Sequence, residues 1–322
     1  MPSIISQRSS KFYLSITFGV LFCLVMALFT GSLHGQATSK VGEVIMILMS
    51  AGLVFGAFYI PIRFYKNAPR ITIDKESISF NNSTYYWNEL ENIGMTGKRP
   101  FKFIGERKEG VSLKFKYQDE KYIFDDMYSN SPQIKNFIQQ VVINKAPFGE
   151  YQKMEIDPRE LTFEKFNYYK GYQLLSFEGI ILWGLNLFLI YICTVDYLRH
   201  HHSLSICMPI IFCSLILIIF SRRMYYFGIS NKFLVIRNQN FFWIKRAFQL
   251  SDIKEIVFEQ RHKMPVTLRV INEDFTYESY PASTLWNKRW RQLKVDLENK
   301  GIKVRNECIP DYEPFEFKFF ND

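Results

Sequence analysis

The sequence predicts a membrane protein of mixed class, in which four transmembrane helices form two hairpins and a β-rich α+β domain follows each hairpin. Three observations support this prediction. The chain has 322 residues, 48% of them hydrophobic, and these are concentrated in four long apolar segments. The stretches after the second and fourth segments alternate apolar and polar residues, as half-buried strands do. These two stretches also match each other, which indicates a duplicated unit of roughly 155 to 163 residues.

Each apolar segment is long enough to cross roughly 30 Å of hydrocarbon as a helix. The four predicted spans cover residues 12–30, 44–60, 174–195 and 204–220, and the second is expected to end at Pro61. Arg8 and Lys11 precede the first span as they would in a signal peptide. The apolar stretch is long, however, and no clean cleavage site follows it, so we interpret the first span as an uncleaved anchor.

Positive charges predict how these spans are oriented. The links inside the hairpins, residues 31–43 and 196–203, contain only Lys40 and Arg199 as fixed positive charges. The flanks outside the hairpins contain Arg8, Lys11, Arg63, Lys66, Arg70, Lys165, Lys170, Arg222 and Arg223. By the positive-inside rule, both termini and both soluble domains are expected in the cytoplasm.

Composition argues against several classes of function. The net charge of +9 comes mainly from residues beside the apolar segments, where anionic lipids attract each charge by roughly 1 kcal/mol. We therefore expect a lipid bilayer as a partner and no nucleic acid. The five cysteines include no CxxC pair, so neither a disulfide framework nor a zinc site is expected. No hydrolase, metalloprotease or nucleotide-binding motif occurs, so we expect neither an enzyme nor a cofactor.

The internal repeat rests on several local matches. Residues 71–80 match residues 227–236 as strand, tight turn and strand, and residues 87–93 match residues 250–256. Each half is then expected to close with one amphipathic helix. The predicted apolar stripes are Ile134, Phe137, Ile138 and Val141 in the first half, and Trp286, Trp290, Leu293 and Leu297 in the second. Gly301 is expected to end the second helix.

This arrangement resembles the bacterial membrane proteins with pleckstrin-homology-like (PH-like) domains. The matching pattern is the strand-turn-strand at residues 70–78 followed by Tyr86-Trp87-Asn88-Glu89-Leu90, with a weaker match in the second half. The resemblance implies two bent barrels, each plugged by its helix, at a bacterial inner membrane. The implied segments are hairpin 1 at 1–65, domain 1 at 66–145, a linker with an interfacial helix at 146–173, hairpin 2 at 174–221, domain 2 at 222–303 and an aromatic tail at 304–322.

Three groups of residues are candidates for function. A basic cluster could contact an anionic lipid or an acidic partner, although a solvated loop explains it equally well; its members are Lys98, Arg99, Lys102, Arg107 and Lys108. Gly52 and Gly56 form a GxxxG motif, which allows close helix packing within the chain or in a homo-oligomer. Glu178 and Asn186 lie eight residues apart in the third span, where a carboxylate is costly and suggests a polar path or a snorkelling side chain.

The expected function is that of a non-enzymatic scaffold or accessory subunit, whose two cytoplasmic domains bind a protein partner. The alternative is a transport or lipid-handling component that uses Glu178 and Asn186. His200, His201 and His202 are interpreted as a polar loop, because adjacent histidines cannot converge on one metal ion without further ligands. The tail at residues 312–322 is rich in phenylalanine, and we expect it to dock as an edge strand.

Overall fold

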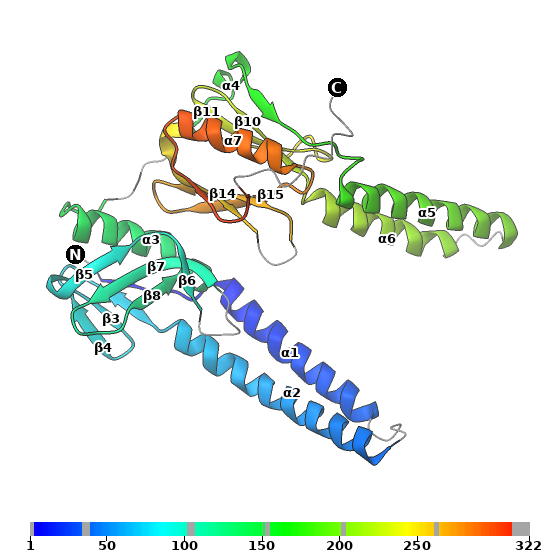
Figure 1. The fold of residues 1–322 in the computed structure, drawn as a ribbon, viewed down its shortest axis with the longest axis horizontal. Coiled ribbons are helices and arrows are strands. Elements are labelled where there is room, and N and C mark those ends of the chain that lie inside the picture. Colours follow the sequence, from blue (N-terminus) through cyan, green and yellow to red (C-terminus); the bar gives the residue numbers. More distant parts are fainter. Residues whose placement is uncertain are drawn as a thin grey trace. The chain divides into compact units, whose positions relative to one another are not determined.

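The computed structural model describes residues 3–33, 39–101, 107–149, 151, 155–200, 204–260 and 264–310. The chain divides into two compact units, Met1–Tyr151 and Gln152–Asp322. In each unit a pair of long helices is connected to a β-rich part (Figure 1).

Three helices are long and apolar enough to cross a membrane. They are α1 (Ser10–Leu33), α2 (Lys40–Asn67) and the Phe177–Val195 part of α5 (Phe177–His200). The next helix, α6 (Leu204–Ser221), shares a buried apolar cluster with α5 through Ile216 and Leu182. Its apolar part among the described side chains, Ile211–Ser221, is shorter than a full span, so the fourth crossing stays a prediction.

The expectation that Pro61 ends the second helix is wrong. Helix α2 continues through Pro61 to Asn67, although an internal proline costs about 3 kcal/mol. The residues that follow offset this cost, because Phe64 and Ala68 are buried in the core of the first unit.

The β-rich part of unit 1 contains two sheets. The first has the order β1-β2-β3-β4 and is antiparallel, with β1 (Ile4–Ile5), β2 (Ile71–Ile73), β3 (Ser77–Phe80) and β4 (Ser83–Tyr86). In the second, β7 (Arg107–Phe115) pairs antiparallel with β5 (Leu90–Gly94), β6 (Lys98–Pro100) and β8 (Lys121–Phe124). Helix α3 (Ser131–Phe137) and the π-helical η4 (Ile138–Ile143) close the unit. One buried cluster joins both sheets and α3, and it includes Ile73, Leu113 and Phe137.

Unit 2 follows the same plan. Its first sheet has the order β12-β11-β10-β9, with β9 (Asn167–Tyr169), β10 (Tyr225–Ile229), β11 (Phe233–Asn238) and β12 (Lys245–Gln249). Its second has the order β15-β14-β13-β16, with β13 (Ile253–Glu259), β14 (Thr267–Asn272), β15 (Tyr277–Pro281) and β16 (Val304–Asn306), the last parallel to β13. Helix α7 (Asn287–Asn299) buries Trp290, Leu293 and Leu297. Gly301 follows it with a φ of +79°, as predicted for a helix end.

Each helical hairpin is inserted between two neighbouring strands of one sheet. Strand β1 precedes α1 and pairs with β2, which follows α2, and β9 precedes α5 and pairs with β10, which follows α6. The sequence had placed β1 in the hairpin segment and β9 in an interfacial helix. The predicted interfacial helix is wrong: of the described residues between 146 and 173, α4 (Glu160–Phe163) alone is helical, and the chain then becomes extended. The buried ring of Tyr169 is a strand residue of the core.

The predicted barrels are also corrected, since the described strands form four separate sheets and no closed barrel. A short 3-10 helix connects the first sheet to the second in each unit, η2 (Trp87–Glu89) in unit 1 and η5 (Leu250–Asp252) in unit 2. These turns interrupt the ladder and redirect the chain, so that two sheets share one core.

The local matches behind the predicted repeat are confirmed. The aligned segments beginning at Trp87 and Leu250 both form the 3-10 helix that precedes a strand. The following strands also share a register shift near their start, after Leu90 in β5 and after Ile253 in β13. A register shift shared at aligned positions is a specific feature of a backbone, because it interrupts the hydrogen-bond ladder at the same point in both units.

Candidate functional site

The structure brings four of the five predicted basic residues together on one hairpin of unit 1, formed by β6 and the start of β7 (Figure 1). The cross-strand pairs are Lys98 with Glu109, Arg99 with Lys108 and Pro100 with Arg107. Directly paired residues share a face of the sheet. Arg99 and Lys108 therefore lie on one face of this basic hairpin, and Lys98 and Arg107 lie on the other. Lys102 is outside the described residues.

Aromatic contacts attach the basic hairpin to the end of helix α2. The ring of Phe101, which follows β6, is buried and lies 5.4 Å from the ring centroid of Phe64 in the last turns of α2. The Lys108 ammonium lies 4.7 Å from the Phe101 centroid and 5.8 Å from that of Phe64. Such ring pairs and cation–π contacts each contribute about 0.5 to 1.5 kcal/mol. The hairpin is thus held beside the end of α2, a helix long and apolar enough to cross a membrane.

The Arg99 side chain packs against the sheet of unit 1 that contains β5 and β7. Its guanidinium lies over Gly94, where the Cβ of any other residue would collide with it, and it donates a hydrogen bond to the Thr96 carbonyl at 3.3 Å. Burial, followed by a hydrogen bond to Glu120, raises the pKa of the nearby Tyr122 phenol, and the positive charge of Arg99 opposes this rise.

The opposite face combines positive and negative charge. Arg107 is exposed on this face, whereas the carboxylate of Glu109 is buried and accepts a hydrogen bond from the Gly97 amide. This face therefore carries the cations Lys98 and Arg107 beside the buried carboxylate of Glu109. Such a mixture of charges is better suited to binding an acidic protein surface than to holding a phosphate group in a deep pocket.

The two glycines of the GxxxG motif have different surroundings. At Gly56 a Cβ would lie 3.6 Å from the Cys23 sulfur of α1, whereas at Gly52 nothing lies within 4 Å. Ser50 also donates a hydrogen bond of 2.9 Å to the Ala27 carbonyl of α1. The α1–α2 hairpin therefore uses Gly56 for packing within the chain, and Gly52 faces away from this contact.

Glu178 and Asn186 have separate partners. A Glu178 carboxylate oxygen lies 3.7 Å from an Arg223 guanidinium nitrogen, just beyond the end of α6. The Asn186 amide donates a hydrogen bond of 2.6 Å to the Leu182 carbonyl within its own helix. Glu178 lies in the first turn of α5, so its carboxylate sits near the helix start and is paired there.

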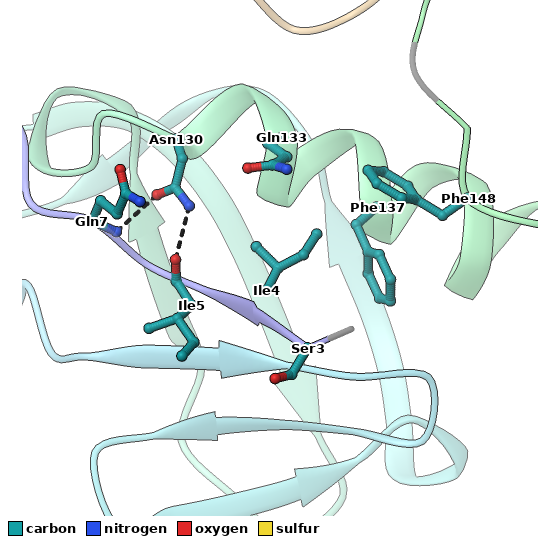
Figure 2. Close-up of a pocket in the computed structure, with 8 residues that line it drawn as sticks. All are labelled: Ser3, Ile4, Ile5, Gln7, Asn130, Gln133, Phe137 and Phe148. Carbon is teal, nitrogen blue, oxygen red and sulfur yellow. Dashed lines mark hydrogen bonds between the residues drawn. The ribbon is translucent and has the colours of Figure 1, made fainter. Parts of the chain in front are cut away.

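A pocket lies between β1 and α3 (Figure 2), and its volume is about 460 Å³. Ile4, Phe137 and Phe148 line its apolar part, and the two rings lie 5.4 Å apart. Asn130 occupies one end, where its side chain accepts a hydrogen bond from the Gln7 amide and donates one to the Ile5 carbonyl. These bonds attach the edge strand β1 to the start of α3 without any charged group.

No cluster of three or more His, Cys, Asp or Glu side chains within the described ranges could hold a metal ion. His201 and His202, together with the aromatic tail at residues 312–322, are outside the described residues, and the side chain of His200 is not described either. No protein-family model matches the chain, and a search of curated proteins gave no match.

One feature of the second unit was missed from the sequence. The turn between β11 and β12 presents Phe242 and Trp243 to the surface, and it lies beside the end of α6 and the segment that precedes α5. The signal was available in the run Phe241-Phe242-Trp243 followed by Lys245 and Arg246, which combines an aromatic cluster with basic residues. Predicting a surface site from this run also requires the position of the turn, which hydrogen bonds to Ser221 and Gln173 determine.

Proposed function

We propose that this chain is a non-enzymatic scaffold of a bacterial inner membrane, which crosses the bilayer four times and presents two PH-like domains in the cytoplasm. The single observation that carries this proposal is the insertion of each helical hairpin between two paired strands of one sheet. Two short connections then attach each domain to its membrane helices. A domain held in this way presents a constant surface, which suits recruitment of a partner.

The PH-like assignment is supported by the arrangement of each unit. Two four-stranded sheets share one apolar core, and a helix late in the unit packs into that core. The cytoplasmic orientation is supported by the concentration of Lys and Arg outside the hairpins, including Arg63 and Arg222.

The basic hairpin of unit 1 is the proposed contact surface for an acidic protein partner. Arg107 is exposed and Lys98 is half-buried. Charge pairs near the surface contribute about 0.2 to 1 kcal/mol each, so these two residues would set orientation and association rate more than affinity. A transport role has less support, because Glu178 pairs with Arg223 and Asn186 with its own helix.

A photo-crosslinking amino acid tests this proposal when it replaces Arg107 in the full-length protein in native membranes. The control position is Tyr117, which is fully exposed in the turn just beyond the other end of β7. We expect a discrete protein adduct from position 107 and none from position 117. Lys98→Glu should reduce the adduct at least fivefold, and Lys116→Glu, an exposed residue near Tyr117, should not. Lipid adducts alone at position 107, or no adduct, would refute the contact with a partner.

A further inference from the structure

An aromatic turn connects β11 to β12 in unit 2, and we use this name for residues 239–244. The side chains of Phe242 and Trp243 are 83% and 65% exposed. The Trp243 ring contacts both neighbouring phenyl rings, with centroid distances of 5.2 Å to Phe241 and 5.0 Å to Phe242. A contiguous aromatic cluster of this kind on a surface indicates an apolar partner.

Hydrogen bonds place the aromatic turn at the ends of the membrane helices. The buried Asn238 donates to the Ser221 carbonyl at 2.6 Å, and Asn240 donates to the Ser221 hydroxyl at 2.6 Å. Ser221 is the last residue of α6. The Gln173 side chain, which precedes α5, also donates to the Asn240 side chain. The turn is therefore hydrogen-bonded both to the segment that leads into the second hairpin and to the residue that ends it.

The aromatic turn is also preorganised. The Asn238 side chain accepts hydrogen bonds of 2.9 Å from the amides of Asn240 and Phe241. The Gln239 amide donates to the Met224 carbonyl at 3.0 Å, and the Ile244 amide to that of Phe241 at 2.9 Å. Because the backbone is already ordered, little conformational entropy is lost when the rings enter an apolar phase.

The surroundings of the turn have the composition of a membrane interface. Exposed apolar side chains lead from it into α5; they are Tyr172, Leu174, Leu175 and Phe177. Exposed basic residues flank it; they are Arg222, Lys245 and Arg246, the last also 3.9 Å from Glu278. Aromatic rings prefer the boundary between headgroups and acyl chains, and Lys and Arg attract anionic headgroups.

We propose that the aromatic turn inserts into the headgroup–acyl boundary of the membrane that α5 crosses. The occupant of this surface is lipid, and the turn acts as a third attachment of unit 2, beside its two connections to α5 and α6. Phe242 and Trp243 enter the boundary, while Lys245 and Arg222 face anionic headgroups. Asn238 is a positioning residue, because it holds the turn against Ser221.

The test uses the full-length protein in vesicles of phosphatidylethanolamine and phosphatidylglycerol. A photo-crosslinking amino acid replaces Trp243, and a matched control replaces Lys232 in the turn at the opposite end of β11. We expect lipid adducts from position 243 at a yield at least fivefold above position 232. Equal yields, or adducts to protein from position 243, would overturn the proposal.

A second measurement avoids any risk that the crosslinker perturbs folding. Trp243→Phe keeps an aromatic ring at an exposed position, so the difference in emission between wild type and variant isolates the Trp243 signal. We expect lipids brominated near the start of the acyl chain to quench this signal at least twofold, and aqueous iodide to quench it little. Strong quenching by iodide with none by brominated lipid would place the ring in water and refute insertion.

Discussion

Asp74 and Ser230 occupy matching positions in the two units and stabilise the same tight turn with different chemistry. The Asp74 carboxylate accepts hydrogen bonds from the amides of Glu76 at 2.9 Å and Ser77 at 2.7 Å. The Ser230 hydroxyl accepts the corresponding bonds from Lys232 at 3.2 Å and Phe233 at 3.0 Å. One turn is therefore charged and the other neutral, which makes them a natural pair for comparison.

The Asp74 turn is expected to weaken in acid, and the Ser230 turn is not. Burial alone would raise the pKa of Asp74, but the hydrogen bonds from Glu76 and Ser77 hold it below its ordinary value of 3.8. A lowered pKa stabilises the folded state above the unfolded value, and this stability is lost as the pH falls through the folded pKa. Asp74→Ala should therefore cost about 1 kcal/mol near neutral pH, and less below pH 3.8.

Hydrogen exchange at the Ser77 and Phe233 amides in the solubilised full-length protein measures this difference. Ser230→Ala is the matched variant, since its cost should remain constant over the same pH range. A constant cost for Asp74→Ala down to pH 2 would contradict the assignment.

Lys135 and Asp125 form a buried ion pair in unit 1, and removing one partner should be strongly destabilising. The Lys135 ammonium lies 2.6 Å from one Asp125 oxygen and 2.8 Å from the other, with side chains 2% and 4% exposed. Lys135→Met leaves a buried carboxylate and should cost about 3 to 5 kcal/mol. The double variant Lys135→Met with Asp125→Asn should cost less. Thermal unfolding measures these losses of stability. The exposed Lys116→Met is the control, and its stability is expected within about 0.5 kcal/mol of wild type.

The two glycines of the GxxxG motif should respond differently when a large side chain replaces them. Gly56→Ile places a branched side chain against Cys23 of α1 and should lower thermal stability by about 1 to 3 kcal/mol through overpacking. Gly52→Ile enters open space within the chain and should leave stability unchanged. Size-exclusion chromatography with light scattering provides the second readout. A change of oligomeric state in Gly52→Ile alone would show that this face contacts another copy.

Glu178 and Arg223 should behave as a coupled pair. Their side chains are 13% and 33% exposed with 3.7 Å between charged atoms, so a double-mutant cycle with Glu178→Gln and Arg223→Gln should give a coupling of about 0.5 to 1 kcal/mol. Glu178→Gln with Asn186→Leu is the control cycle and should be additive. Coupling only in the second cycle would instead favour a polar path.

Local patterns in the sequence predicted much of the secondary structure, because they depend on neighbours along the chain. The apolar segments around α1, α2 and α5 predicted three long helices, and the run ending at Gly301 predicted where α7 stops. The turns at Asp74 and Ser230 followed from short polar residues between strands. The four basic residues of the hairpin were found as a cluster, but their division between two faces depends on the strand register, which no single segment contains.

What the sequence by itself determined is which segments are apolar enough for a bilayer and which alternate as strands, since both properties are sums over local side chains. Only the tertiary structure decided that β1 and β9, each on the far side of a helical hairpin from its partner strand, complete the first sheet of each unit. Tertiary packing also decided that Gly56 contacts α1 and that the turn carrying Phe242 and Trp243 lies beside the end of α6 and the segment that precedes α5. The physical reason is that these pairings depend on packing contacts and hydrogen bonds between residues far apart in the chain, which the apolar pattern of a single segment does not reveal.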